Sequence, residues 1–130
     1  MSRATRMRGI WGILLSMVLS GCAVGRTDVV LLNPEPHYRA FASDAPVILT
    51  TTDLENPYRE LGVIHVSGVS REGYQGLNEK LRTEARRIGA DAVIFVHYGT
   101  ENAFSIIPLF VAIPYDVLTA EGVAVRSKNR

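Results

Sequence analysis

The chain has 130 residues, one cysteine and a formal charge of +1 at pH 7. This length allows one small domain, and a single cysteine excludes a disulfide scaffold within the chain. A hydrophobic content of 47% with 21% charged residues indicates a globular domain, not a disordered one. Residues 1–21 carry three arginines and no acid, so the rest of the chain is slightly acidic. A nucleic-acid-binding protein is therefore not expected, because phosphate recognition needs a clustered basic surface.

Residues 1–21 have the three parts of a secretory signal. A basic start precedes the apolar stretch Ile10–Leu19, which is too short to be a stable membrane-spanning helix. The sequence then reads Leu19-Ser20-Gly21-Cys22, with two small residues directly before the cysteine. We therefore expect a signal peptide that is cleaved after Gly21.

These four residues resemble the lipobox of bacterial lipoproteins. The resemblance implies that the Cys22 thiol carries diacylglycerol and that the new amino terminus carries an acyl chain such as palmitate. Several acyl chains give lasting membrane anchorage, whereas one chain alone is marginal. Ala23, in place of Asp, favours the outer membrane, facing the periplasm, over the inner membrane. The alternative is an ordinary signal peptide or an uncleaved anchor with a chance cysteine.

Residues 22–45 are expected to form the lipidated cysteine and a tether. Val29–Leu32 could be a short strand, but the two prolines of Asn33-Pro34-Glu35-Pro36 cannot continue a helix or a central strand. We expect the folded domain to occupy residues 46–130.

The domain is predicted to be α+β, with a β-β-α-β-β order and one helix packed on a mostly antiparallel or mixed sheet. The β-branched run Val47–Thr52 predicts the first strand, and Tyr58–Val66 predicts the second. Residues 75–88 are predicted to be the helix, and Gly89 its left-handed cap. Apolar residues recur there at helical spacing and form one stripe: Leu77, Leu81, Ala85 and Ile88.

The apolar run Ala92–Tyr98 predicts a third strand, buried on both faces or packed between the helix and a partner. A turn is predicted at Gly99–Asn102. The last strand is predicted from about Asp116 to Arg126.

The segment 104–118 is unusually apolar, but it is too short and too broken by Pro108 and Pro114 to span a membrane. Two readings stay open. The segment completes the core as an extra strand pair, or it exposes an interaction patch that joins subunits, docks an envelope protein or touches the membrane. The patch would contain six residues: Ile106, Ile107, Leu109, Phe110, Val111 and Ile113.

Three stretches of the domain, Glu60–Gly68, Leu81–Ile94 and Gly122–Val125, are similar to the YbjQ-like family, whose small bacterial domains are often labelled heavy-metal-binding. They are also similar to related lipoproteins, including the Rcs stress-sensor outer-membrane lipoprotein. The resemblance implies an α+β domain with one helix on a sheet and, in the YbjQ-like branch, a ring-shaped homo-oligomer. The folded domain here lacks cysteine. This excludes a thiolate metal site and the intramolecular disulfides of the stress-sensor lipoprotein.

His65 and His97 are the candidates for metal or ligand binding, because they lie on two predicted strands and could face the same side. Their spacing matches no ligand motif such as HExxH, and zinc requires about four donors, so neither a metal nor a cofactor is expected. No G-x-S-x-G motif is present either, so no catalytic residue is expected.

The sequence thus predicts a lipid-anchored cell-envelope protein that acts as a non-catalytic interaction or self-assembling module. Its partners would be the membrane, through Cys22, and a second copy of the chain or an envelope protein. The alternative is an envelope module that binds a small ligand or metal through His65 and His97. A hydrolytic enzyme ranks third.

Overall fold

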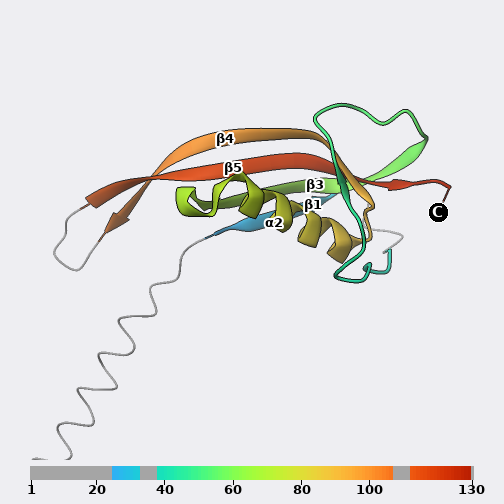
Figure 1. Ribbon diagram of the computed structural model, residues 1–130, viewed down its shortest axis with the longest axis horizontal. Coiled ribbons are helices and arrows are strands. Elements are labelled where there is room, and N and C mark those ends of the chain that lie inside the picture. The colour runs from blue at the N-terminus through green and yellow to red at the C-terminus, as the bar shows by residue number, and fades with distance from the viewer. Residues whose placement is uncertain (1–24, 33–37, 107–111, 130) are drawn as a thin grey trace, which may run out of the picture.

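The structure is a computed structural model that describes residues 25–32, 38–106 and 112–129, with the side chains of residues 105 and 106 left undescribed. One helix, α2 (Gly73–Ile88), packs on a five-stranded sheet (Figure 1). The strands are β1 (Thr27–Leu31), β2 (Ile48–Leu49), β3 (Tyr58–Val69), β4 (Ala92–Ile106) and β5 (Ala112–Ser127), and a short 3-10 helix, η1 (Ser70–Glu72), precedes α2. The predicted α+β fold is confirmed.

The sheet order is β1-β3-β5-β4-β2, and β2 pairs with β4 in parallel while all other neighbours are antiparallel. Residues Thr27–Leu31, within the segment expected to be a tether, form the edge strand β1 and pair with β3. The strand predicted over Val47–Thr52 is wrong in length, because only Ile48–Leu49 is strand. Thr50 still bonds β4 through its backbone, because its N–H donates to the Val93 carbonyl and its carbonyl accepts the N–H of Val96. Its hydroxyl accepts the backbone N–H of Thr52, a local bond that competes with further pairing.

The helix confirms its predicted apolar stripe, since Leu77, Leu81 and Ala85 are fully buried. They pack with β3 and β5 residues in the main core. Gly89 ends the helix at φ 79°, as predicted. A side chain there would also meet the Cβ of Tyr38 at 2.7 Å, because the segment before β2 packs against this end of the helix.

The second face of the sheet is covered only in part. Ala92 and Ile94 of β4 are buried there with Val125, packed against Leu54 and Tyr58. Leu54 belongs to the connection between β2 and β3, whose course Figure 1 shows. The predicted burial on both faces is therefore confirmed for the start of β4, where residues of the same chain cover the second face. Further along β4, Phe95 is 49% exposed.

A bulge interrupts β4 between Ile94 and His97, where two residues oppose Gly122 of β5. Phe95 takes a left-handed backbone conformation there, with φ 53°. A Cβ on Gly122 would lie 2.6 Å from Cγ1 of Val93. The bulge therefore crowds β5 so closely that only glycine fits.

The turn predicted at Gly99–Asn102 is wrong, because these residues lie inside β4 and pair with β5. Ladder hydrogen bonds on β5 outweigh the local turn preference of Gly and Asn. The two strands continue as a hairpin to the pair Ile106↔Ala112, so β5 begins before the predicted Asp116. Because β3 ends at Val69, opposite Val117, the outer part of this hairpin has two strands only.

Candidate functional site

Both candidate histidines occupy one row of the sheet. His65 on β3 and His97 on β4 are each opposite Glu121 of β5, and Asp28 of β1 is opposite His65. Residues opposite one another share a face, so the two histidines lie on one side of the sheet, as the sequence suggested. This side faces away from α2, because Ile64 and Val66, the neighbours of His65, pack with the helix. Within the described ranges, however, no three His, Cys, Asp or Glu side chains are arranged to hold a metal ion.

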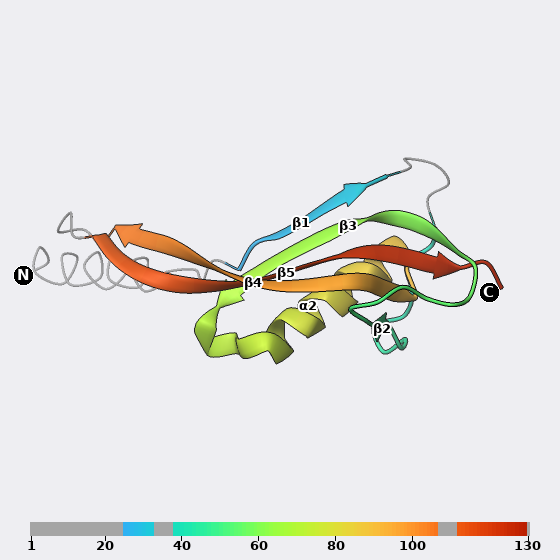
Figure 2. The same ribbon diagram turned by 90° about the horizontal axis from the view of Figure 1, so that it is seen from above.

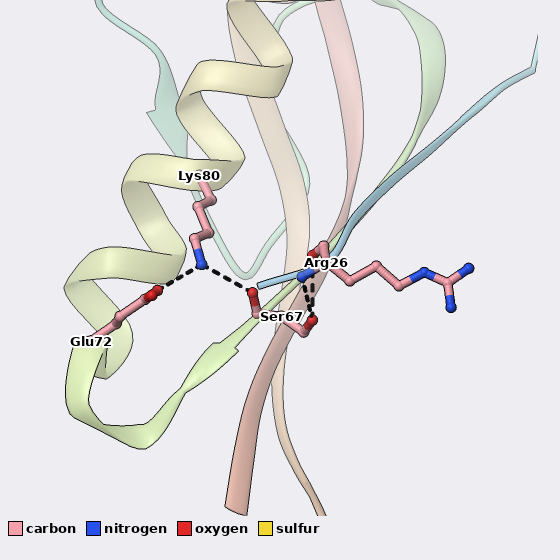
Figure 3. A network of polar contacts seen from close by, with 4 residues as sticks. All are labelled: Arg26, Ser67, Glu72 and Lys80. Carbon is pink, nitrogen blue, oxygen red and sulfur yellow. Dashed lines mark hydrogen bonds and ion pairs between the residues drawn. The ribbon is translucent and has the colours of Figure 1, made fainter. Parts of the chain in front are cut away.

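The start of the described chain is held firmly to the sheet and the helix (Figure 3). The N–H of Ser67 donates to the carbonyl of Arg26 at 2.8 Å, and the N–H of Arg26 donates to the Ser67 hydroxyl at 3.0 Å. Lys80 of α2 donates from Nζ to the Ser67 carbonyl at 3.1 Å and pairs with the Glu72 carboxylate at 2.6 Å. These bonds connect the chain entering β1 to β3 and to the helix.

Gly25 fits this network because it has no side chain. A Cβ at this position would lie 2.5 Å from Nζ of Lys80 and 3.2 Å from the carbonyl oxygen of Ser67. A side chain at this position would therefore displace the Lys80 ammonium from its two hydrogen bonds or shift the chain.

The base of the β4–β5 hairpin lies beside this chain start. Arg26 and Asp28 line one cavity of about 250 Å³ together with Glu101, Asn102 and Ala103 of β4. Arg26 and Asp28 also form an ion pair at 2.8 Å. Figure 2 shows the hairpin continuing past the end of β3 and the start of α2, at the end of the sheet where β1 begins.

The hairpin exposes apolar side chains. Phe104 is 68% exposed and Ile113 is 47% exposed. In the register, Phe104 is opposite Pro114 and Ser105 is opposite Ile113. Ile113, one of the six residues of the predicted patch, is thus exposed, and so is Phe104, which the predicted patch omitted. Because they stand in adjacent rows of the register, the two side chains lie on opposite faces of the hairpin. The described parts of the segment also form a strand pair, as the other reading expected, and whether the exposed residues make an interaction patch stays a prediction.

Other predicted site residues fall outside what can be described. Cys22, Ile107, Leu109, Phe110 and Val111 lie outside the described residues, and Ile106 lies in β4 without a described side chain. In the described part of the chain, no helix is long and apolar enough to cross a membrane.

The Arg26–Ser67 clamp is the part of the site that sequence reasoning missed. It joins residues 41 positions apart, and no local pattern marks such a pair. For Phe104 a signal did exist, since it begins the apolar run.

Comparison with known proteins gives a likeness of fold. No family model matches the chain, and no curated protein matches it. A solved structure is similar: a protein of unknown function from Pediococcus pentosaceus, described as belonging to the DUF74 family, with a TM-score of 0.51 and 16% identity. The match covers 63% of this chain and 98% of that one. DUF74 is the YbjQ-like family, so the fold implied by the resemblance agrees with the fold of this solved structure.

Proposed function

We propose that this protein is a lipid-anchored, non-catalytic contact module of the bacterial cell envelope, held at the outer membrane through Cys22 and making contact through the β4–β5 hairpin. In this proposal the chain is a lipoprotein with a YbjQ-like domain, related to the Rcs stress-sensor lipoprotein. The observation that carries the proposal is the exposure of Phe104, 68%, and Ile113, 47%, on a two-stranded extension.

Exposed apolar side chains on such an extension favour a contact role. Phe104 and Ile113 lie on opposite faces of the hairpin, so both of its faces present an apolar side chain to water, and exposed apolar surface marks protein or membrane contacts when it is extensive. An isolated two-stranded hairpin is also only marginally stable in water. A partner that covers Phe104 and Ile113 would remove apolar surface from water and stabilise the hairpin at the same time.

The position of β1 supports anchorage close to the domain. Since the described chain is already clamped at Arg26, only three residue steps separate Gly25 from Cys22. Such a segment reaches at most about 10 Å. The free part of the tether is therefore much shorter than the expected 22–45, and the base of the hairpin is held near the lipid.

Lipidation is tested by feeding an alkyne-labelled palmitate to bacteria that express the full chain or Cys22→Ser. We expect acyl label on the natural chain and none on Cys22→Ser. Ala23→Ser is the matched control, because it introduces the same side chain one residue later and keeps the thiol. Acyl label of equal intensity on Cys22→Ser would overturn the anchor.

The contact is tested by thiol accessibility in intact envelopes. An introduced cysteine is the one free thiol once Cys22 carries lipid, because the chain has a single natural cysteine. We expect a water-soluble maleimide to label Ile48→Cys, at a position that is 60% exposed at the other end of the sheet, and to label Phe104→Cys several-fold less. Equal labelling would contradict a contact at the hairpin.

Metal or small-ligand binding by His65 and His97 is the second candidate. It is favoured by the register, which places both histidines opposite Glu121. Calorimetric titration with Zn²⁺ would show binding that His97→Ala removes and that Asn102→Ala, on the same strand, retains. No heat of binding with the natural chain would rule out a zinc site there.

A further inference from the structure

We infer that the hairpin's partner is a lipid surface: Phe104 and Ile113 enter the headgroup and upper acyl region of the leaflet that holds the lipid on Cys22. The inference rests on the proposed lipidation and names the partner of the proposed contact. Its consequence is a fixed orientation, since a lipid anchor alone leaves the domain free to turn, whereas two contacts at one end of the sheet do not.

Strand direction places the anchor and the hairpin at the same end. β1 is antiparallel to β3, β3 is antiparallel to β5, and β5 is antiparallel to β4. β3 and β4 therefore both run toward the tip of the hairpin, and β1 begins at the same end of the sheet. Arg26, before β1, and Asn102 and Ala103, in the hairpin, also line the same cavity.

The reach of the chain from Gly25 to Cys22 is similar to the length of the outer part of the hairpin. The lipidated cysteine can be no more than about 10 Å from Gly25, which lies at the base of the hairpin. From Asn102 to Ile106 the strand extends about 14 Å at the usual rise per residue. A lipid attached so close to the base brings the outer part of the hairpin to the membrane surface, with no other protein needed.

Charge along the hairpin separates a lipid-facing part from a water-facing part. No charged residue lies between Glu101 and Asp116 in the sequence. The two acids stand at nearly one level, because Asn102 is opposite Asp116 and Glu101 is opposite Val117. Both are exposed, so they mark where the hairpin must leave the lipid, since a carboxylate is strongly disfavoured in the hydrocarbon region.

Tyr115 lies directly on the lipid side of this boundary. It is opposite Ala103 and partly buried. Tyrosine is enriched at membrane–water interfaces, because its ring is apolar and its hydroxyl stays hydrated. The order acid, tyrosine, then phenylalanine and isoleucine is the order expected from headgroup to acyl chain.

Unpaired backbone groups limit how deeply the hairpin can enter the bilayer. Beyond Val69 of β3, the outer edge of β5 has no neighbouring strand among the described residues. The edges of a two-stranded hairpin carry unpaired N–H and C=O groups, which lipid hydrocarbon cannot satisfy. The hairpin therefore stays at the boundary of headgroups and acyl chains, about 5–10 Å deep, as interfacial segments do, and does not span the bilayer.

Depth-dependent tryptophan quenching tests the inference on the lipidated full-length protein. The chain has one tryptophan, Trp11 in the expected signal, so Trp11→Phe gives a background without native tryptophan signal. Phe104→Trp and Ile48→Trp then each add one probe at exposed positions, at opposite ends of the sheet. Each variant is reconstituted in phosphatidylethanolamine–phosphatidylglycerol vesicles with or without acyl-brominated lipid, and circular dichroism checks its fold.

We expect brominated lipid to quench the probe at position 104 at least twofold more than the probe at position 48. Mass spectrometry of the same samples reports the lipid on Cys22. If position 104 is shielded from aqueous acrylamide but not quenched by brominated lipid, the hairpin contacts a second copy of the chain, which is the one protein in these vesicles, and the lipid inference fails while the proposed contact stands. If position 104 is open to acrylamide on a lipidated chain, the lipid inference fails, and the maleimide labelling in intact envelopes decides separately whether the proposed contact stands.

Discussion

Arg26 and Ser67 are joined by hydrogen bonds although 41 positions separate them. The N–H of Ser67 donates to the Arg26 carbonyl at 2.8 Å, and the Ser67 hydroxyl accepts the N–H of Arg26 at 3.0 Å. This pair decides where the chain from Cys22 joins the sheet. It places that junction beside the base of the β4–β5 hairpin, and so connects the proposed anchor with the proposed contact.

Lys80 should hold this junction in place. We expect Lys80→Met to cost about 0.5–1.5 kcal/mol of unfolding free energy, because it removes the hydrogen bond to the Ser67 carbonyl and the pair with Glu72. Amide hydrogen exchange at Arg26 should become faster. Arg82→Met is the control, since it removes an ion pair with the exposed Glu79, which is worth little. Unchanged exchange at Arg26 in Lys80→Met would show that Lys80 is not part of the clamp.

The hairpin residues should matter for contact and hardly at all for folding in solution. We expect Phe104→Ser and Ile113→Ser to change the free energy of unfolding by no more than about 0.5 kcal/mol, because both side chains are exposed. Leu81→Ala, in the buried stripe of α2, should cost about 2–5 kcal/mol. Urea unfolding of the unlipidated chain measures all three. A loss above 2 kcal/mol for Phe104→Ser would mean that the hairpin is part of the core.

At the β4 bulge, substitutions on the two paired strands should affect stability differently. Gly122→Ala should destabilise the protein by about 1–3 kcal/mol, because the added Cβ would meet Val93 at 2.6 Å. Phe95→Gly should change stability by less than about 1 kcal/mol. The loss of a half-exposed ring is offset by relief of the left-handed backbone, which costs about 1–2 kcal/mol in non-glycine residues. Thermal unfolding distinguishes the two variants, and a neutral Gly122→Ala would argue against the crowded bulge.

Tyr58 should ionise at unusually alkaline pH. Its hydroxyl donates a 2.6 Å hydrogen bond to the Asp53 carboxylate, and this bond, aided by partial desolvation and nearby negative charge, raises the pKa of Tyr58 above 10.0. A raised pKa favours the protonated phenol in the folded state. This contribution to stability is therefore complete below pH 10 and is lost as the pH rises through the folded pKa.

Absorbance titration at 295 nm checks this expectation. Tyr58→Phe should remove the late-ionising tyrosine, and Asp53→Asn should move its ionisation to lower pH. Asp44→Asn serves as the control, because Asp44 is not among the groups that raise the Tyr58 pKa. An Asp53→Asn titration identical to that of the natural chain would rule out the hydrogen bond as the cause.

Local features of the sequence were sufficient for part of the structure and part of the site. The stripe of Leu77, Leu81 and Ala85 with Gly89 behind it predicted the helix, because an α-helix is stabilised by contacts three and four residues apart. The run Tyr58–Val66 likewise predicted most of β3. The lipobox-like residues before Cys22 are a local signal too, and they led to the anchor prediction that still awaits its test.

Tertiary structure decided what depends on distant partners. The residues Gly99–Asn102 favour a turn in isolation, yet they extend along β5 because the backbone groups that face β5 find ladder partners there. In the same way Thr27–Leu31 becomes a strand only because β3 offers it an edge. Local preferences of this kind amount to about 1 kcal/mol, and pairing between distant strands outweighs them. The sequence alone thus determined the helix, the β3 strand and an apolar segment 104–118, and only the folded sheet placed that segment beside the start of β1.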